Sequence, residues 1–485
     1  MKYRAASGNI SKETFLRIWI AALLLICVVW GGGSAETPAA RDSSLLNRQF
    51  QAAVAHYQEH QYAQAEQILN GLLKQVPGNF DLNELMGLVC RAQGQVSRAG
   101  GYLAAAVRAR PTSAEARMYW AANFVDLHQS LRAEREFKEA VQLEPNNFIT
   151  NHNLGEYYIR RGNLEGAIPY LRKAQLVNPS AYNNGYDLAL AEIKAGDYAG
   201  AKAGLERLLH YHSAADLHSL LAEADEKTGE YIRAADEYEL AARMEPSEDN
   251  VFALGSELLM HHTLAPAAQV FTRGIQLYPH SARMRVGMAV VFYSRGMYSQ
   301  AIESFCRAID LSPDDARPYQ FLGAIYDVSP LQARAVTERF SRFARLQPRN
   351  PQALYYYALS LWKGSENEAK PVNFGVVEGL LERAVALNPS FADAHLQLGI
   401  LDFRQRRYSE AIEQYHQAIK YQPDLAEAYY RLGEAMVRTG QRPQARLELR
   451  TFNRLHEQQT AERAHQRSQI MQFVYTVIPP GKNSR

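Results

Sequence analysis

The sequence predicts an all-α protein built as a stack of about twelve helical hairpins, and three recurring features predict it. Prolines recur about every 34 residues, alanines and large apolar residues precede each proline at helical spacing, and a large–small residue pair lies further upstream. A fixed period of this size is typical of stacked supersecondary units rather than of one globular core. The proline ladder consists of Pro77, Pro111, Pro145, Pro179, Pro246, Pro279, Pro313, Pro348, Pro389 and Pro423, with Ser213 in the fifth place.

The run that ends at each proline predicts the second helix of a pair. In most repeats alanine stands twelve residues before the proline, a large residue such as Leu103 or Phe137 stands eight before it, and alanine stands five before it. These spacings place the three residues on one face of a helix. The proline then ends the helix, because it lacks an N–H and clashes with the preceding turn.

The upstream run predicts the first helix of each pair. It carries a large residue followed by a tiny one, as in Leu154-Gly155 and Leu322-Gly323, and such a pair lets two helix backbones approach closely. Glycine inside a helix costs up to about 1 kcal/mol relative to alanine, so its recurrence indicates a packing demand. A polar turn joins the two helices, and glycine there adopts the positive φ that ends a helix. These turn glycines are Gly94, Gly162, Gly196, Gly229, Gly296 and Gly440.

Twelve units follow this pattern in order along the chain. The ninth unit has Pro330 where the turn glycine would be, and the tenth carries extra residues in 363–374. The first and last units are degenerate, as is typical of terminal repeats. The predicted units span 46–79, 80–113, 114–147, 148–181, 182–214, 215–247, 248–281, 282–315, 316–350, 351–391, 392–425 and 426–457.

Together these features resemble the tetratricopeptide repeat family. The resemblance implies an all-α fold, a right-handed α-solenoid superhelix of antiparallel helix pairs, in which the first helices line a concave groove. It also implies a non-catalytic protein–protein interaction scaffold that binds a peptide or protein partner in that groove. The repeats occupy nearly all of 46–457, so no room remains there for a catalytic domain. The fullest match is Leu154-Gly155, Tyr158, Gly162, Ala167, Leu171, Ala174 and Pro179.

The resemblance also indicates which residues face the groove. At those positions repeats seven to ten are unusually apolar, whereas earlier repeats are more polar and include Glu84. A continuous exposed apolar strip is typical of partner sites, and aromatic side chains are the usual anchors. Packing against the neighbouring helix is the alternative role for several of these residues. The predicted partner-binding strip comprises Phe252, Leu259, Val286, Val290, Tyr293, Phe321, Tyr355, Tyr356, Leu359 and Trp362.

Charge, cysteines and motifs narrow the classes of function. Lys and Arg total 53 against 51 Asp and Glu, so no basic excess favours nucleic acid as a partner. No phosphate-binding loop, nucleophile elbow, HExxH or paired CxxC motif occurs. Cys90 and Cys306 are expected to be small buried side chains rather than a disulfide. We therefore expect neither an enzyme nor a cofactor.

Two histidine groups keep open an alternative of another class, a metal-dependent enzyme. His210, His212 and His218 straddle the junction of repeats five and six, and His261 and His262 are adjacent in the turn of repeat seven. Imidazoles ligate a metal where they converge. Histidines near helix ends more often complement backbone carbonyls, so no metal site is expected.

The N-terminus has the features of an export signal. Basic residues up to Arg17 precede an apolar stretch at 18–30, and small residues follow as far as Ala35. Residues 1–35 are predicted to be a signal peptide and 36–45 a linker, which places the protein in the bacterial periplasm or cell envelope. The alternative is an uncleaved membrane anchor that holds an accessory of envelope assembly or polysaccharide export at the membrane. That apolar stretch is shorter than the roughly 20 residues of a spanning helix.

The C-terminal end differs from the other repeats. No proline or glycine follows Pro443 until Pro479, so the second helix of repeat twelve either continues beyond 457 or is followed at once by another helix. We expect 458–485 to form a capping helix and tail that shield the last repeat. The alternative is a docking tail for a partner or a membrane surface.

Overall fold

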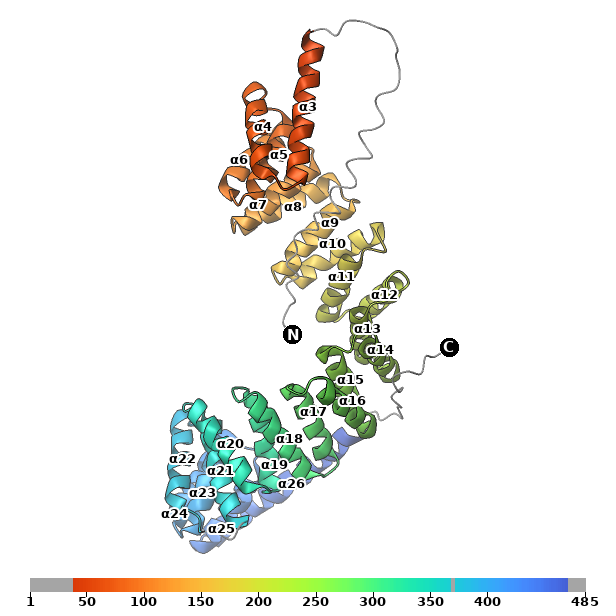
Figure 1. Ribbon diagram of the computed structural model, residues 1–485. Helices are drawn as coiled ribbons and strands as arrows, with labels where there is room; N and C mark the ends of the chain where they lie inside the picture. Colours follow the sequence, from red (N-terminus) through yellow and green to blue (C-terminus); the bar gives the residue numbers. More distant parts are fainter. Residues whose placement is uncertain (1–37, 368–370, 470–485) are drawn as a thin grey trace. The chain divides into compact units, whose positions relative to one another are not determined.

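The part of the chain that the structure describes consists of paired α-helices. A computed structural model describes residues 38–367 and 371–469, and within these ranges it contains 24 helices and no strand (Figure 1). Each odd-numbered helix is the first of a pair and the following even-numbered helix is the second, which gives twelve pairs. The predicted fold class, an all-α solenoid of antiparallel helix pairs, is confirmed.

The chain divides into two compact units, one ending at Leu154 and the other beginning at Gly155, a boundary that lies within α9. The helices of the first unit are α3 (Pro38–Gln58), α4 (Tyr62–Gln75), α5 (Phe80–Ala92), α6 (Val96–Ala109), α7 (Ala114–Asp126), α8 (Ser130–Leu143) and the start of α9 (Phe148–Arg160). The second unit continues with α10 (Leu164–Val177), α11 (Tyr182–Ala195), α12 (Tyr198–Leu209), α13 (Ala215–Lys227), α14 (Tyr231–Met244), α15 (Glu248–Met260), α16 (Leu264–Leu277), α17 (Ala282–Ser294) and α18 (Tyr298–Leu311). Its remaining helices are α19 (Ala316–Val328), α20 (Ala333–Leu346), α21 (Pro351–Asn367), α22 (Phe374–Leu387), α23 (Ala392–Arg404), α24 (Tyr408–Tyr421), α25 (Ala426–Arg438) and α26 (Arg442–Gln469).

The two ends of the chain are only partly described. Residues 1–37, which include the predicted signal peptide, and residues 470–485 of the predicted tail lie outside the described residues. The helix α3 begins at Pro38, so most of the predicted linker at 36–45 is helical, and proline suits the first position of a helix. At the other end, α26 runs unbroken to Gln469. No helix in the described ranges is both long and apolar enough to cross a membrane.

Several of the first helices begin at side-chain caps. An Asn, Ser or Asp side chain accepts a hydrogen bond from a backbone N–H of the first turn, as Asn79 does from Leu82 at 3.0 Å. Such a cap satisfies a donor that has no partner within the helix and contributes about 1 kcal/mol. The same arrangement begins α7, α15, α17 and α19 at Ser113, Ser247, Ser281 and Asp315.

In eleven of the twelve pairs, the described residues of the turn include one in the left-handed region. All six predicted turn glycines have a φ between 72° and 84°, which confirms the prediction. Other pairs place a non-glycine residue in this conformation with a φ between 55° and 63°. In the ninth pair that residue is Gln332, two positions after Pro330. The remaining non-glycine turn residues are His60, His128, His262 and Arg406.

The two helices of a pair touch most closely where the sequence places its large–small motif. A Cβ built on Gly87 would lie 2.6 Å from Leu103, and one built on Gly255 would lie 2.7 Å from the ring of Phe271. Neither distance leaves room for a methyl group, because side chains in protein interiors are close-packed. The prediction that close packing requires these glycines is therefore confirmed. The side chain that packs on each glycine comes from the second helix, at the position eight residues before the proline.

The core of each unit is a series of local clusters. In the first unit the alanines Ala65 and Ala99 and the large residues Met86 and Leu103 are fully buried in one cluster shared by neighbouring pairs. In the second unit separate clusters form around Leu205, Phe271, Phe305, Leu381 and Tyr415. Each cluster draws on neighbouring pairs, so its stability depends on local neighbours.

Both cysteines of the described residues are buried and free, as expected. Burial raises the pKa of the Cys306 thiol to about 11. A thiol with a raised pKa is a poor nucleophile, so Cys306 acts as a small apolar side chain of the core.

The close approach around Phe271 yields a stability prediction. A Cβ at Gly287 would overlap the Phe271 ring, so Gly287→Ala is expected to destabilise the fold by about 1–3 kcal/mol through overpacking. A Cβ at Gly379, inside α22, meets no atom within 4 Å. Gly379→Ala is therefore expected to stabilise by about 0.5–1 kcal/mol, because alanine loses less entropy in a helix. Urea-unfolding midpoints measure the change in stability of each variant. Equal changes in the two variants would contradict the close approach at Gly287.

Candidate functional site

The structure places the residues of the predicted strip at three levels of exposure. Tyr293 on α17 and Phe321 on α19 are exposed, at 44% and 49%. Leu359 and Trp362 on α21 are buried, at 4% and 3%. The other six are half-buried: Phe252, Leu259, Val286, Val290, Tyr355 and Tyr356.

The half-buried residues lie over successive core clusters. Phe252 packs against the cluster around Phe271, and Val290 and Tyr356 pack against the cluster around Phe305. The exposed ring of Phe321 stacks on Phe305 with their centroids 5.7 Å apart. The structure therefore gathers part of the strip, including Val286, over one cluster, where it both packs and presents apolar surface.

Burial of Leu359 and Trp362 corrects the predicted strip. The Trp362 indole belongs to the cluster that contains Leu381, its Nε1 donates to Glu366 Oε1 at 2.9 Å, and Arg404 lies 5.2 Å from the ring centroid. Trp362 shares this cluster with Val377 and Leu381 of α22 and with Leu398 and Leu401 of α23, so residues of two neighbouring helices cover it. Leu359 and Trp362 thus stabilise the core and do not face a partner.

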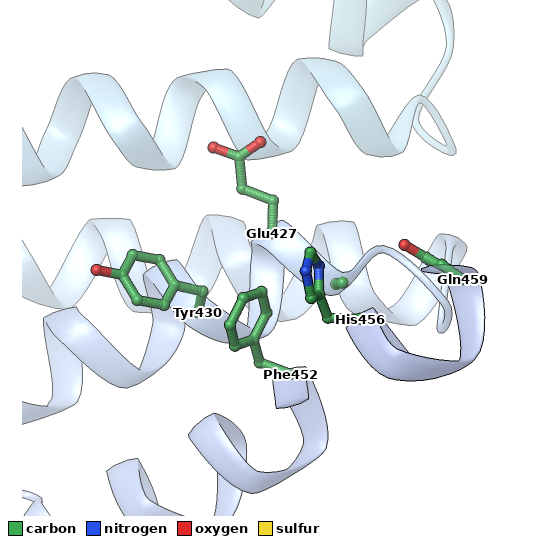
Figure 2. A pocket seen from close by; sticks show the side chains of 6 residues that line it. Glu427, Tyr430, Phe452, His456 and Gln459 are labelled. Carbon is green, nitrogen blue, oxygen red and sulfur yellow. The ribbon is translucent and has the colours of Figure 1, made fainter. Parts of the chain in front are cut away.

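A pocket that the sequence did not predict lies between α25 and α26 (Figure 2). It has a volume of about 350 Å³, and the rings of Tyr430 and Phe452 line it with centroids 5.3 Å apart. His456 and Glu427 also line this pocket. The length of the last helix is the feature of the sequence that could have indicated this pocket. A second helix of ordinary length would end before His456 and Gln459, which line it.

The histidines that could have formed a metal site do not converge. His210 hydrogen-bonds to the backbone carbonyl of Glu206, His212 to that of Ser180, and His218 to the carboxylate of Glu237. Among the described residues, the one group of side chains that could hold a metal ion is Glu226, Glu257 and His261. The neighbouring His262 is exposed.

Comparison with known protein families identifies the repeat. Residues 50–114, 120–182, 186–249 and 252–316 match the family described as Tetratricopeptide repeat, and residues 401–440 match the one described as TPR repeat. These segments make up more than half of the chain. The chain belongs to the tetratricopeptide repeat (TPR) family. The matches leave out 317–400, which holds the two departures from the pattern, Pro330 and the insertion at 363–374.

Similar curated proteins share only part of their length with this TPR chain. Human protein O-mannosyl-transferase TMTC3 is 21% identical over 298 residues, which cover 61% of this chain and 30% of that protein. Human TMTC1, also a protein O-mannosyl-transferase, is 25% identical over 39% of this chain and 22% of its own. The cytochrome c-type biogenesis protein CycH of Pseudomonas aeruginosa is 28% identical over 148 residues, 29% of this chain and 35% of CycH. The chain therefore spans about a third or less of each of these relatives.

Solved structures with a similar arrangement include Naa15/Naa10 bound to HypK-THB, with a TM-score of 0.39, 16% identity and coverage of 83% of this chain and 68% of that chain. YrrB, described as a TPR protein with an unusual peptide-binding site, has a TM-score of 0.33, 21% identity and coverage of 38% and 96%. TPR proteins generally bind protein or peptide partners, so the family supports a role as a protein-interaction scaffold.

The first unit of the TPR stack carries a buried carboxyl group on a first helix. Burial, followed by the neighbouring carboxylates Glu115 and Asp81, raises the pKa of Glu84 to about 8. Its Oε1 has no hydrogen-bond partner among the described residues. Nearby, Tyr119 donates a hydrogen bond of 2.8 Å to Glu115. The raised pKa favours the protonated form of Glu84 at neutral pH, beside the carboxylates of Glu115 and Asp81.

The raised pKa of Glu84 makes a pH prediction. The folded state keeps the proton up to about pH 8, whereas the unfolded chain releases it near 4.5, so the folded state binds more protons between these values and its stability falls as pH rises through them. Glu84→Gln keeps the shape without the ionisation. We expect its melting temperature to exceed that of the wild type at pH 8 and to match it at pH 4.5. The exposed Glu59→Gln serves as the control, and a difference that does not vary with pH would contradict the raised pKa.

Proposed function

We propose that the chain is a scaffold that binds a protein partner on the first helices of its second unit, at the part of the strip that stays exposed. The observation that carries this proposal is the position of Phe321, whose exposed ring stacks on the buried Phe305. A large aromatic ring held in place by a core residue, with half its surface open, has the properties of an interface anchor. Tyr293 on the preceding first helix is a second such ring.

Rigid support favours binding at this surface. Tyr356 stacks on the buried Phe340 with centroids 5.4 Å apart, and Val286 and Val290 pack on the same core cluster. Side chains that packing already holds in place lose little conformational entropy when a partner binds. An extended peptide suits a surface of this kind, since its side chains can contact successive helices while the scaffold stays unchanged.

The proposal is tested by a matched pair of double variants. Tyr293→Ala with Phe321→Ala removes the two exposed rings of the first helices, and Leu176→Ala with Ile232→Ala removes two exposed apolar residues of second helices in the same unit. Partners captured by the wild-type chain from an extract of its own cells are purified, and their affinity for each variant is measured by calorimetry. We expect the first variant to bind more than about tenfold more weakly, because anchors each contribute roughly 1–2 kcal/mol, and the second to bind like the wild type.

Circular dichroism establishes that both double variants keep the helical fold. Unchanged affinity of the Tyr293–Phe321 variant, or an equal loss in both variants, would place the binding surface elsewhere. Binding that is lost instead on replacing Tyr430 and Phe452 would assign it to the pocket between α25 and α26.

Export is a second part of the proposal. The basic and apolar N-terminal segment supports a signal peptide removed after Ala35, and a place in the periplasm or cell envelope. The alternative is an uncleaved N-terminal anchor that holds an accessory of envelope assembly or polysaccharide export at the membrane.

Intact mass spectrometry of the protein purified from its own host distinguishes these two arrangements. We expect a mature chain that begins at Glu36 and is recovered in the soluble envelope fraction. A chain that keeps its first 35 residues and sediments with membranes would instead establish an N-terminal anchor.

A further inference from the structure

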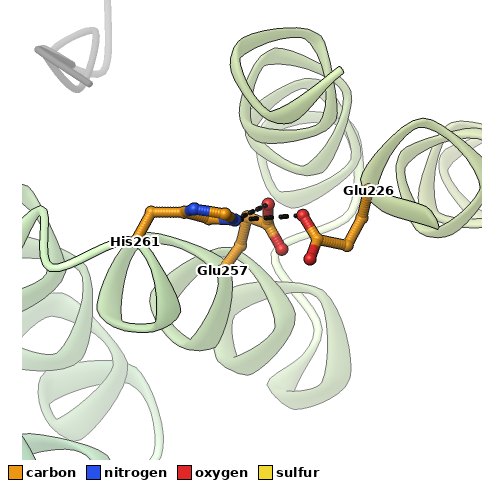
Figure 3. A group of neighbouring side chains, drawn as sticks. All are labelled: Glu226, Glu257 and His261. Atoms are coloured by element: carbon orange, nitrogen blue, oxygen red, sulfur yellow. Dashed lines mark hydrogen bonds and ion pairs between the residues drawn. The ribbon is translucent and has the colours of Figure 1, made fainter. Parts of the chain in front are cut away.

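Three side chains that are far apart in the sequence meet in the second unit (Figure 3). Glu226 comes from the last turn of α13, Glu257 from the last turn of α15, and His261 directly follows α15. Their candidate ligand atoms all lie within 4.8 Å of one another. None of the three belongs to the partner-binding strip or to the pocket at α26.

The fold fixes the position of His261 from several directions. Its backbone N–H donates to the carbonyl of Glu257 at 3.2 Å, and His262 takes the left-handed conformation with a φ of 55° that turns the chain toward α16. The ring of Tyr231 lies against the imidazole with centroids 4.3 Å apart. The turn of this pair therefore holds the imidazole toward the two carboxylates, as Figure 3 shows.

The distances within the cluster match those between ligands of one small ion. His261 Nε2 lies 3.0 Å from Glu226 Oε2 and 3.4 Å from Glu257 Oε1. Zinc–nitrogen and zinc–oxygen bonds of about 2.0–2.1 Å place two tetrahedral ligands about 3.3 Å apart. The two carboxylate oxygens lie within 4.8 Å of each other, so a dication between the three groups would draw them together.

An unsatisfied carboxylate oxygen points into the same space. The Glu257 side chain is only 2% exposed, and its Oε1 has the long 3.4 Å ion-pair contact with His261 but no hydrogen bond among the described residues. A buried polar atom without a partner costs free energy, so each such atom calls for a ligand, an ion or another explanation. A cation bound between the two carboxylates and the imidazole satisfies this oxygen.

The surroundings are acidic and dry, which favours a cation. Burial and then Glu226 raise the pKa of Glu257 to about 8, with Lys227 as an opposing charge. The pKa of Tyr238 is also raised, by burial and then by Glu257, Glu223 and Glu226. A dication relieves the repulsion between the two carboxylates, since it brings two positive charges to them.

We propose that Glu226, Glu257 and His261 form a binding site for one divalent transition-metal ion, best fitted by Zn²⁺, that links repeats six and seven. An imidazole nitrogen with two carboxylate oxygens is a zinc ligand set, whereas Ca²⁺ and Mg²⁺ select oxygen ligands alone. The ion ties the end of α13 to the end of α15 and the turn after it. Its role is structural, because it stabilises the stacking of two neighbouring repeats.

The test uses Zn²⁺ alone, titrated by calorimetry into the full chain after treatment with a chelator. We expect one high-affinity ion per chain and a higher melting temperature with Zn²⁺, because an ion that binds only the folded state stabilises it. Cobalt(II) in place of zinc is expected to give visible absorption bands typical of a low-coordinate site with nitrogen and oxygen ligands.

Matched variants distinguish this site from the other histidines of the chain. Glu257→Gln and His261→Asn each remove one ligand and are expected to weaken binding by about tenfold or more and to abolish the cobalt bands. His262→Gly is the control, since it removes the adjacent exposed histidine at a position where glycine tolerates the positive φ. We expect it to bind like the wild type.

Three results would overturn the proposal: no Zn²⁺ binding by the wild-type chain, binding unchanged in both ligand variants, or equal loss in the His262→Gly control. Circular dichroism without metal verifies the fold of each variant. If Glu257→Gln is less helical than the wild type, His261→Asn carries the test together with the cobalt spectrum, which reports the ligands directly. Absence of binding would leave Glu226 and Glu257 as a carboxyl pair that shares a proton beside His261.

Discussion

Each helix pair depends on one close contact between its two helices. A large side chain of the second helix lies over a small residue of the first, and where that residue is glycine, as at Gly87 beneath Leu103, there is no room for a Cβ. Burying a Leu or Phe side chain contributes about 1.5–3 kcal/mol, and the close approach adds dispersion contacts between the backbones. The contact recurs at Gly155, Gly255 and Gly399, whereas at Gly323 it is Tyr356 of the next pair that approaches the glycine. The local clusters of the core join one pair to the next.

A stack with this kind of core leaves other residues free for function. The buried alanines and large residues are set by the helix pairing, whereas the groove positions of the first helices vary along the chain and are most apolar in repeats seven to ten. The rings of Phe321 and Tyr293 pack only partly on the core and leave part of their surface exposed. Because packing already holds these rings in place, they lose little conformational entropy when a partner binds. The geometry therefore supports recognition of a partner by fixed anchors on a preformed surface.

Buried carboxyl groups are a second feature of the structure. Asp225 is fully buried, and Lys202 and Arg233 lie at 2.7 Å and 3.2 Å from its two oxygens. Burial raises the pKa of all three carboxyl groups, to about 8 for Glu84 and Glu257, but of the three only Asp225 lies beside both a lysine and an arginine that form ion pairs with it. An isolated buried charge costs several kcal/mol, so such groups either take up a proton or bind a cation. The environment of Glu257 offers an imidazole and a second carboxylate, which is why it is the better candidate for an ion.

The sequence by itself determined the repeat, because the causes of each element are local. Proline ends a helix, glycine permits a positive φ, and apolar spacing selects one helical face, so the helix pairs, turn glycines and buried alanines could all be predicted from the order of residues. Only the tertiary structure decided which groove positions stay exposed. Leu359 and Trp362 follow the same pattern as Phe321 but are buried, and Trp362 packs in a cluster with residues of α22 and α23. The pocket beside Phe452 and the cluster at Glu257 arise from residues on different helices, and their burial and distances depend on how successive pairs stack, which the one-dimensional pattern does not specify.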